Sequence, residues 1–316
     1  MHIAVLDDYQ SVALTSADWS TLESRADIEV FGDHIADEDA LVTRLEGFDG
    51  IVAMRERTPF PRSLVERLPN LKLLITTGER NASFDLAALR EADVTVCGTG
   101  SRGGATAELT WGLILALMRG IPLEHTAIAE GHWQDAVGRD LGDKTLGVLG
   151  LGRLGSQVAT VGRAFGMPVV AWSQNLTRER ADEIGVELAS SLDELLERSD
   201  VATIHLVLSK RTRGLIGASE LVRLGSDAYL VNTSRGPIVD ETALVGALRA
   251  RTIAGAGLDV FEVEPLPAGH PLIGLENVVL TPHIGYVTEE TYAVFYRDAV
   301  EDVVAYLAGS PVRVIE

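Results

Sequence analysis

The sequence predicts an α/β protein built from two doubly wound domains. Short apolar runs rich in β-branched residues alternate with helical patterns along almost the whole chain, which is typical of parallel sheets covered by helices. A glycine-rich turn also lies between a strand pattern and a helix pattern near the middle of the 316 residues. With 46% hydrophobic residues, the chain can bury the cores of about two domains.

Charge and cysteine content exclude several classes of protein. The formal net charge of -19 argues against nucleic acid and anionic membranes as partners, because both need a basic surface. The single cysteine, Cys97, excludes an internal disulfide, and its neighbours indicate a small buried residue rather than a nucleophile. The chain shows no signal-peptide pattern and no apolar run of about 18 residues, so we expect a cytoplasmic protein.

The first domain is expected to begin directly on a strand. Its strand patterns are "HIAVLDD", "IEVFGD", "GIVAMR", "LKLLITTG" and "VTVCG", which together predict one doubly wound unit. The apolar helix pattern "TAELTWGLILALMR" follows at residues 106–119 and is expected to connect two domains. It is also a candidate dimer interface across a two-fold axis, although burial within one chain explains it equally well.

The second domain begins at about residue 144. Its strand patterns are "TLGVLG", "PVVAW", "VATIHL", "AYLVNTS", "IAGAGLDV" and "NVVLTPHIG". A last helix at about residues 289–307 is expected to return the chain to the first domain. The sequence therefore predicts one domain of residues 1–101 and 286–316, and a second domain of residues 102–285.

A glycine-rich turn identifies a dinucleotide site in the second domain. The strand pattern "TLGVLG" leads into "GLGRLG", which gives Gly150, Gly152 and Gly155 the G-x-G-x-x-G spacing. The first glycine permits a sharp turn, the second lets the backbone approach a pyrophosphate, and the third allows close packing of the next helix. A merely structural glycine turn is the alternative, and the flanking strand and helix patterns argue against it.

The choice between NAD and NADP depends on the residues after the next strand pattern, "PVVAW". An aspartate or glutamate there would accept a hydrogen bond from the ribose 2′-hydroxyl and select NAD. Ser173, Gln174 and Asn175 occupy this place instead, and Arg178 and Arg180 follow. NADP is therefore slightly favoured over NAD, unless both arginines are solvent-facing helix residues.

Three segments after the glycine turn suggest an acid–base site. They are "VNTSRGPIVD", "GLDVFEVEP" and "TPHIG", and each follows a predicted strand. The carboxyl ends of parallel strands face the cofactor, so Arg235, Glu264 and His283 are expected to converge. Singly they have plain explanations, as a turn arginine, an acid before a proline and a loop histidine. Their joint occurrence favours a shared catalytic site over these three separate explanations.

Four stretches carry a resemblance to the D-2-hydroxyacid dehydrogenase family over essentially the whole length of the chain. They are "GVLGLGRLG", "NTSRGPIVDETAL", "AGAGLDVFEVEP" and "NVVLTPHIG", in the order and spacing of that family. The resemblance implies a flavodoxin-like substrate domain and a Rossmann dinucleotide-binding domain. It also implies that Arg235 binds the substrate, that Glu264 is the acid paired with the histidine, and that His283 is the proton donor.

The chemistry of these residues fits the roles that the resemblance implies. Hydride delivery to a ketone leaves negative charge on its oxygen, which a protonated His283 neutralises by donating its proton. A hydrogen bond from Glu264 would orient the ring and favour its charged form. Arg235 offers a planar fork of donors to the carboxylate of a 2-oxo acid.

The resemblance further implies contacts with cofactor and substrate. Along the cofactor it places Gly150, Gly152, Arg153, Leu154, Gly155, Ser173, Gln174, Asn175, His205, Thr233, Ser234, Asp259 and Gly285, with Asp259 at the nicotinamide carboxamide. At the substrate it places Arg55, Thr77, Gly78, Arg235 and His283, with backbone amides of the Gly78 loop receiving the carboxylate. Arg80 and Arg102 are weaker candidates for the same anion pocket.

Three positions bear on which branch of the family is present. Val207 in "IHLVLS" stands where proline is usual, which puts the loop around His205 in doubt. Tyr286 in "HIGYVT" replaces a residue that is small in several branches, and we expect it to narrow the pocket or to line it with an aromatic face. Glu264 stands where formate dehydrogenases carry glutamine, which argues against formate oxidation.

The sequence thus predicts an NAD(P)-dependent D-2-hydroxyacid dehydrogenase, acting on CH–OH donors, that interconverts a small 2-oxo acid and its D-2-hydroxy acid. Reduction of an imino acid or oxidation of phosphite by the same geometry stays open, as does a cofactor-sensing corepressor on the same fold. No metal site is expected, because the seven histidines form no H-E-x-x-H or His-x-His cluster. The resemblance also implies a homodimer.

Overall fold

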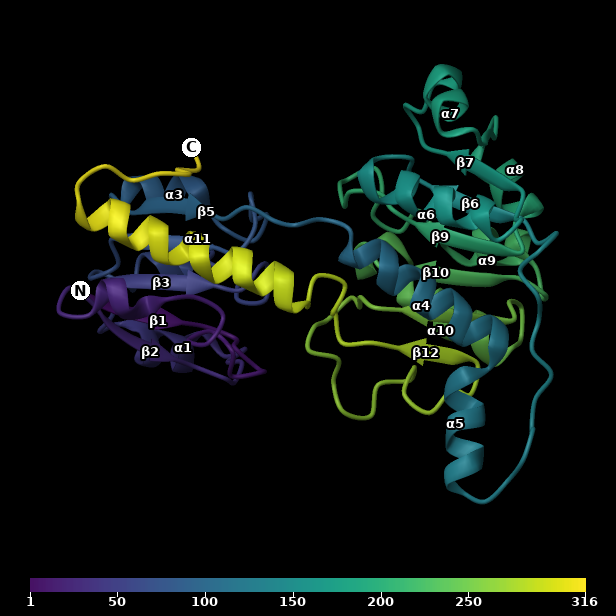
Figure 1. Cartoon of the computed structure of the whole chain (residues 1–316), viewed down its shortest axis with the longest axis horizontal. Helices are drawn as coiled ribbons and strands as arrows, with labels where there is room; N and C mark the ends of the chain where they lie inside the picture. The colour runs from purple at the N-terminus through teal and green to yellow at the C-terminus, as the bar shows by residue number, and fades with distance from the viewer. The chain divides into compact units, whose positions relative to one another are not determined.

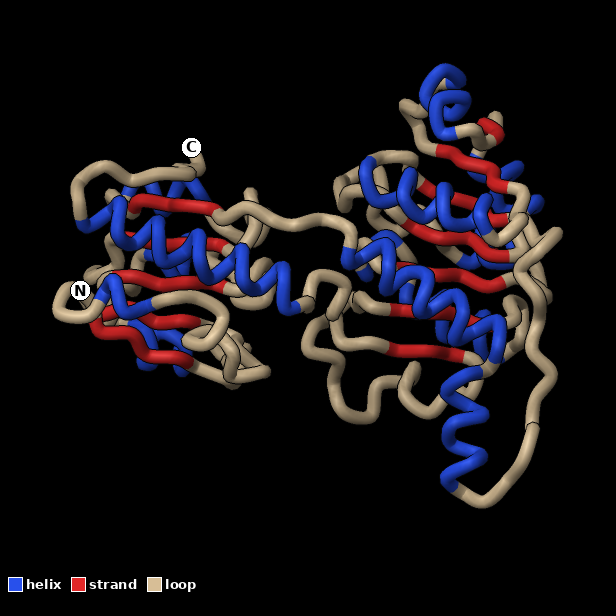
Figure 2. The backbone as a smooth tube through the Cα atoms, viewed as in Figure 1, coloured by secondary structure: helices blue, strands red, loops and turns tan.

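The computed structural model describes all residues, Met1–Glu316. The chain divides into two compact units: unit 1 comprises Met1–Arg102 and Val287–Glu316, and unit 2 comprises Gly103–Tyr286 (Figure 1). In each unit the strands form one layer with helices over it (Figure 2). The prediction of an α/β protein with two doubly wound domains is confirmed.

Unit 1 is built on a five-stranded parallel sheet in the order β2-β1-β3-β4-β5. The strands are β1 (His2–Val5), β2 (Asp27–Val30), β3 (Gly50–Ala53), β4 (Leu73–Thr76) and β5 (Thr95–Gly98). β3 and β4 are buried at every position, as expected of parallel strands with both faces covered. The strand order is the flavodoxin-like one, with its topological switch point between β1 and β3.

Helices cover this sheet on both faces. They are η1 (Trp19–Leu22), α1 (Glu38–Leu45), α2 (Arg62–Val65), α3 (Leu86–Glu91) and α11 (Glu289–Leu307). Aspartate side chains cap α1 and α3, where Asp37 and Asp85 each accept a hydrogen bond from a first-turn amide. α1, α2 and α3 share one apolar cluster with the sheet, whereas α11 packs against η1 and β4. Residues from both ends of the chain therefore complete unit 1.

Unit 2 is built on a seven-stranded parallel sheet in the order β12-β11-β10-β9-β6-β7-β8. The strands are β6 (Leu146–Leu149), β7 (Val169–Trp172), β8 (Glu187–Leu188), β9 (Val201–Ile204), β10 (Tyr229–Asn232), β11 (Gly255–Leu258) and β12 (Val278–Leu280). The sequence does not predict β8, because a strand of 2 residues is too short to show a pattern. The order is that of a Rossmann fold, with the switch point between β6 and β9.

The helices of unit 2 pack on both faces of its sheet. They are α4 (Ala105–Arg119), α5 (Ile121–Ala129), α6 (Arg153–Ala164), α7 (Arg178–Ile184), α8 (Leu192–Arg198), α9 (Ala218–Leu224), η2 (Gly236–Ile238) and α10 (Glu241–Arg249). One apolar cluster joins α4 and α6 to the sheet, and a second cluster joins α8, α9 and α10 to it. Apolar strands between two such layers explain why the strand patterns run continuously rather than alternate.

The apolar helix α4 is used within unit 2. Trp111, Leu113, Ile114 and Met118 are buried in the cluster that α4 shares with α6 and β6. Burial in one chain therefore accounts for the apolar character of α4 without a partner subunit. No single helix is long and apolar enough to cross a membrane, and α4 and α5 pass that test only as a pair bent by 62°.

Candidate active site

The turn between β6 and α6 needs glycine at two positions for reasons internal to the protein. Gly150 has a φ of +98°, a left-handed conformation that favours glycine, and a Cβ there would collide with the backbone of His205. A Cβ on Gly155 would collide with the Gly150 carbonyl oxygen, so the close approach of α6 to the turn also requires glycine.

Gly152 is different, because a Cβ at this position would meet no protein atom within 4 Å. The absence of a side chain at Gly152 therefore leaves space beside the turn for a bound ligand. Gly152 is also the N-cap of α6, where no side chain accepts a hydrogen bond from the first helical amides, those that follow at Arg153 and Leu154. Open amides at a helix N-terminus, beside an open glycine, fit the pyrophosphate of a dinucleotide.

The predicted acid and histidine are in direct contact. Glu264 follows β11, and His283 follows the neighbouring strand β12 with a backbone φ of +52°. His283 Nδ1 lies 2.5 Å from Glu264 Oε2, and the other carboxylate oxygen accepts a hydrogen bond from the Phe261 amide at 2.9 Å. Because Nδ1 is engaged by the carboxylate, Nε2 is the ring nitrogen to consider for proton transfer.

A buried carboxylate shapes the turn that carries His283. Asp259, after β11, accepts hydrogen bonds from Thr281 Oγ1 at 2.6 Å, from the Ile284 amide at 2.8 Å and from the Gly285 amide at 2.9 Å. Burial raises the pKa of Asp259, while these hydrogen bonds act in the opposite direction. Asp259 therefore fixes the turn from inside, and its implied contact with the nicotinamide stays a prediction.

Arg235 lies at the same edge of the sheet. It follows β10, which pairs in parallel with β11, so Arg235, Glu264 and His283 follow three adjacent strands at one edge of the sheet. Arg235 Nη1 donates to the Ser234 carbonyl oxygen at 2.8 Å, and the Asn232 side-chain amide donates to the Arg235 carbonyl oxygen at 3.0 Å. The backbone that presents this guanidinium is thus held locally.

Three more of the predicted cofactor residues, His205, Thr233 and Ser234, lie between the glycine turn and Arg235 in the sequence. Thr233 Oγ1 shares a hydrogen bond of 2.8 Å with a threonine hydroxyl of α4, and Ser234 Oγ donates to a carbonyl oxygen of the loop after β9. His205 Nε2 lies 3.0 Å from Thr203 Oγ1. Burial lowers the pKa of His205 to about 4, so this ring is neutral at physiological pH and is no rival proton donor.

Three residues assigned to the substrate by resemblance lie together in unit 1. The Arg55 amide donates to Thr77 Oγ1 at 2.9 Å, and the Arg55 guanidinium covers Gly78 so closely that a Cβ on Gly78 would collide with it. The amides of Thr77 and Gly78 donate within unit 1, to the Ala53 carbonyl oxygen at 3.0 Å and to Thr99 Oγ1 at 2.7 Å. The two amides are therefore engaged inside unit 1, and Arg55 Nε lies 3.6 Å from Glu56 Oε2, while Arg80 and Arg102 are exposed.

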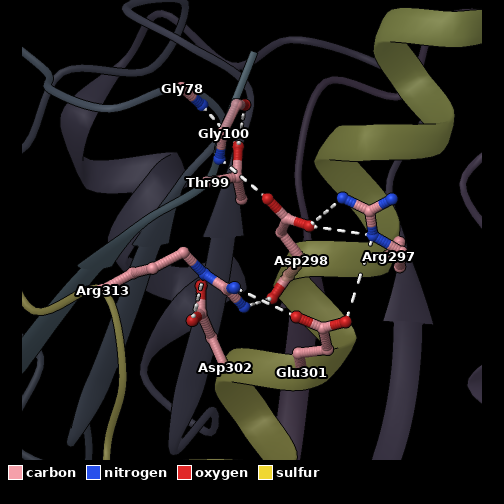
Figure 3. Close-up of polar contacts among 8 residues, drawn as sticks. All are labelled: Gly78, Thr99, Gly100, Arg297, Asp298, Glu301, Asp302 and Arg313. Atoms are coloured by element: carbon pink, nitrogen blue, oxygen red, sulfur yellow. Dashed lines mark hydrogen bonds and ion pairs between the residues drawn. The ribbon is translucent and has the colours of Figure 1, made fainter. Parts of the chain in front are cut away.

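The Gly78 loop is tied to α11 by a chain of hydrogen bonds (Figure 3). Thr99 Oγ1, which accepts from the Gly78 amide, donates to the Gly100 carbonyl oxygen at 3.1 Å. The Gly100 amide in turn donates to Asp298 Oδ2 at 2.8 Å, and the other carboxylate oxygen accepts from Arg297 Nη2 at 2.7 Å. Sequence patterns do not reveal this connection, because its partners are 198 positions apart.

One turn further along α11 lies a second buried acid, Asp302 (Figure 3). Its Oδ1 accepts a hydrogen bond from Arg313 Nε at 2.9 Å, whereas its Oδ2 is buried with no hydrogen-bond partner. Burial raises the pKa of Asp302 to about 7, although Arg313 acts in the opposite direction. Arg313 also donates to Glu301 and to the Asp298 carbonyl oxygen, so it fastens the segment after α11 to the helix.

Two positions that depart from the family pattern occupy different environments. The Tyr286 ring meets the His283 ring edge-on, with centroids 5.7 Å apart and an interplanar angle of 74°. Val207 is exposed, in the loop after β9. Tyr286 is therefore placed to affect the His283 ring. No group of three or more His, Cys, Asp or Glu side chains is arranged to hold a metal ion.

The chain is similar in sequence to a known family and to several of its curated members. Residues 111–285 match the family model described as D-isomer specific 2-hydroxyacid dehydrogenase, NAD binding domain. A glyoxylate reductase of Aeropyrum pernix is 42% identical over 256 residues, which cover 78% of this chain and 76% of that protein. The chain also matches curated D-3-phosphoglycerate dehydrogenases, of whose length it spans about half.

Solved structures extend the similarity to the whole chain. The phosphoglycerate oxidoreductase of Vibrio cholerae O395 has a TM-score of 0.93 at 37% identity, covering 98% of this chain and 100% of that one. An acyclic imino acid reductase, solved in complex with NADPH and D-Arg, has a TM-score of 0.77 at 27% identity, covering 100% of both chains.

Proposed function

Since the chain belongs to the D-isomer specific 2-hydroxyacid dehydrogenase family, an oxidoreductase family that acts on CH–OH donors, we propose that it interconverts a small 2-oxo acid and its D-2-hydroxy acid. The observation that carries this proposal is the 2.5 Å contact between His283 Nδ1 and Glu264 Oε2. It lies after the parallel strands β11 and β12, in the same sheet whose strand β6 leads into the glycine turn.

The catalytic step depends on the free nitrogen of His283. When bound, the nicotinamide cofactor supplies the hydride to the carbonyl carbon. His283 donates a proton from Nε2 to the carbonyl oxygen as negative charge develops there, and accepts it back in the reverse direction. Glu264 keeps the ring in this orientation, since one oxygen contacts Nδ1 and the other is held by the Phe261 amide.

The substrate is proposed to be bound by arginines. Arg235 offers paired donors to the carboxylate beside the reacting carbonyl, and Arg55 contributes a second set of contacts. Support comes from the formal net charge of -19, because an anionic substrate then needs local cations to bind at all. The Tyr286 ring beside His283 favours a small substituent on the 2-oxo acid.

The NAD-binding domain of the family establishes an NAD-type dinucleotide as the cofactor. Within that class we propose NADP as the preferred form. Ser173 is half-buried after β7, Gln174 and Asn175 are exposed beside it, and no carboxylate occurs among residues 173–177. A site without a carboxylate does not repel a 2′-phosphate, and it also lacks the usual acceptor for a 2′-hydroxyl.

We also propose a homodimer, formed by the segment after α4 rather than by α4 itself. α5 extends away from the sheet of unit 2 (Figure 1). Large apolar side chains are exposed on it and on the loop that follows, namely Ile121, Leu123, Ile128, Trp133 and Val137. So many exposed apolar side chains along one segment favour contact with another protein surface over contact with water.

The direct test is absorbance of reduced nicotinamide, with NADH and NADPH in parallel, against glyoxylate, pyruvate, hydroxypyruvate and bulkier 2-oxo acids. We expect oxidation of the cofactor with at least one small 2-oxo acid. His283→Ala should lower kcat by about 10²- to 10⁴-fold while cofactor binding is unchanged. Near-normal turnover by a folded, cofactor-binding His283→Ala variant would refute the mechanism.

A second candidate reaction, reduction of an imino acid, is supported by the similarity to the acyclic imino acid reductase. The same proton donor would serve a nitrogen in place of the carbonyl oxygen. Adding an amine to each 2-oxo acid tests it, because faster cofactor oxidation with the amine than without it would favour the imino acid. Tight cofactor binding with no turnover under any condition would favour a cofactor-sensing protein instead.

A further inference from the structure

A loop far along the sequence places an additional arginine at the end of β7. In a Rossmann fold the strand after the glycine-turn helix ends beside the adenosine ribose, so the residues after β7 face the ribose hydroxyls. Arg211 lies in the loop after β9, and its Nη1 donates to Gln174 Oε1 at 3.2 Å. This contact brings a cation to the position where an NAD-selective site has a carboxylate.

The loop itself holds Arg211 in place. The Arg211 amide donates to Ser209 Oγ at 3.3 Å, the Ser209 amide donates to Thr212 Oγ1 at 2.8 Å, and Thr212 Oγ1 donates to the Val207 carbonyl oxygen at 2.7 Å. Two residues later, Arg213 makes an ion pair with Glu262 at 3.2 Å. Arg211 and Arg213 therefore share one loop but contact different groups.

A second arginine approaches the site from α7. Arg180 Nη2 donates to Ser156 Oγ at 3.1 Å, and Ser156 belongs to α6, the helix whose N-terminus faces the pyrophosphate site. The other Arg180 nitrogen, Nη1, pairs with Glu183 at 2.9 Å. Arg180 is half-buried, whereas Arg178 is exposed at the start of the same helix. Arg180 therefore contacts the helix that follows the glycine turn.

We propose that Arg211 and Arg180 bind the 2′-phosphate of NADP(H), and that Gln174 positions Arg211 for this contact. The inference rests on the proposed function, because it concerns the adenosine end of the same cofactor site. A phosphate monoester offers three strong acceptor oxygens, which match the donors of two guanidinium groups. A 2′-hydroxyl carries no negative charge, so Arg211 and Arg180 would bind NADP(H) in preference to NAD(H).

The first experiment measures binding by titration calorimetry with 2′,5′-ADP and with 5′-AMP, two ligands that differ only in the 2′-phosphate. We expect 2′,5′-ADP to bind at least about tenfold more tightly than 5′-AMP. Arg211→Ala should weaken 2′,5′-ADP by about tenfold or more and leave 5′-AMP unchanged. Arg213→Ala is the matched control from the same loop and should change neither affinity.

The binding outcomes decide the inference without any turnover. Equal binding of the two ligands to the unaltered protein overturns it, and so does an equal loss of both affinities in Arg211→Ala. A selective loss of 2′,5′-ADP supports it. If that selective loss occurs but no 2-oxo acid or imino acid is reduced, the phosphate site stands and the proposed dehydrogenase activity fails.

A reciprocal variant tests the same site by turnover. Gln174→Glu converts the contact with Arg211 into an ion pair that neutralises the guanidinium, supplies an acceptor for a 2′-hydroxyl and repels a 2′-phosphate. The ratio of kcat/KM for NADPH over NADH should fall about a hundredfold, with kcat/KM for NADH maintained or raised. An unchanged ratio in an active variant would overturn the assignment while leaving the dehydrogenase proposal intact.

Discussion

At the residue scale, the position of His283 depends on Asp259. The substitution Asp259→Asn replaces one acceptor oxygen by a donor group, so at least one of the three hydrogen bonds from the Thr281 hydroxyl and the Ile284 and Gly285 amides is lost. We expect turnover to fall about tenfold or more and the free energy of unfolding to fall by about 1–3 kcal/mol. Steady-state kinetics and urea denaturation measure the two effects.

The matched control is Thr281→Val, which removes only the side-chain donor and keeps both backbone amides paired with Asp259. It should lower the free energy of unfolding by about 1 kcal/mol. Full turnover in Asp259→Asn would show that the turn keeps its shape without this carboxylate. A selective loss of cofactor affinity in Asp259→Asn would instead support the implied contact with the nicotinamide.

The charge of Glu264 is a separate residue-scale prediction. Glu264→Gln keeps an oxygen that can accept from the Phe261 amide but removes the negative charge beside His283. His283 then lacks its negatively charged partner, and we expect kcat for 2-oxo acid reduction to fall about 10- to 100-fold with cofactor affinity unchanged. Stopped-flow measurement of the hydride step tests this, and an unaltered rate would remove Glu264 from the mechanism.

At the element scale, Asp302 makes the attachment of α11 sensitive to pH. Burial raises the pKa of Asp302 to about 7, above its usual value of 3.8, so the folded state binds the proton more tightly than the unfolded state. The stabilising contribution is full below about pH 4 and is lost as pH rises through 7. From this group alone, the free energy of unfolding should fall by up to about 1.4 kcal/mol per pH unit between pH 5 and 7.

Asp302→Asn should abolish that slope, because the amide does not titrate and still offers an oxygen to Arg313. Thermal unfolding of both proteins at pH 5, 6, 7 and 8 measures it, and the variant should be the more stable one at pH 8. Glu301→Gln is the matched control: it alters an exposed partner of Arg313 and should leave the slope intact. Parallel curves for Asp302→Asn and the unaltered protein would contradict the prediction.

At the scale of the whole molecule, the exposed apolar segment after α4 predicts self-association. Trp133 is 76% exposed and Val137 is 98% exposed in the loop that follows α5. We expect sedimentation velocity to show a dimer, and the double substitution Trp133→Ser with Val137→Ser to shift it toward monomer, because both side chains lose their apolar contacts. Val222→Ser on α9, also exposed, is the control and should leave the dimer unchanged.

Sequence patterns are sufficient for the fold and for the convergence of Glu264 and His283, because both depend on strand order, whereas the direct pairing of the two side chains is predicted only by the family resemblance. Parallel strands carry continuous apolar runs, and residues that follow neighbouring strands meet at one edge. The patterns could not show that Arg211 reaches Gln174, or that Asp298 reaches Gly100, because these contacts join loops and helices distant in sequence. Such partners are set by side-chain direction in the folded chain, which periodicity does not encode.

The return of the chain to unit 1 has a consequence for its synthesis. Unit 2 is one continuous stretch, Gly103–Tyr286, whereas unit 1 needs Phe295, Tyr296 and Val303 of α11 to fill its interior. A chain emerging from the ribosome therefore exposes an unfinished unit 1 while unit 2 becomes able to fold. Nascent chains arrested when Tyr286 has just left the ribosomal exit tunnel, with α11 still inside it, should accordingly bind dinucleotide while their first hundred or so residues remain open to protease or chaperone.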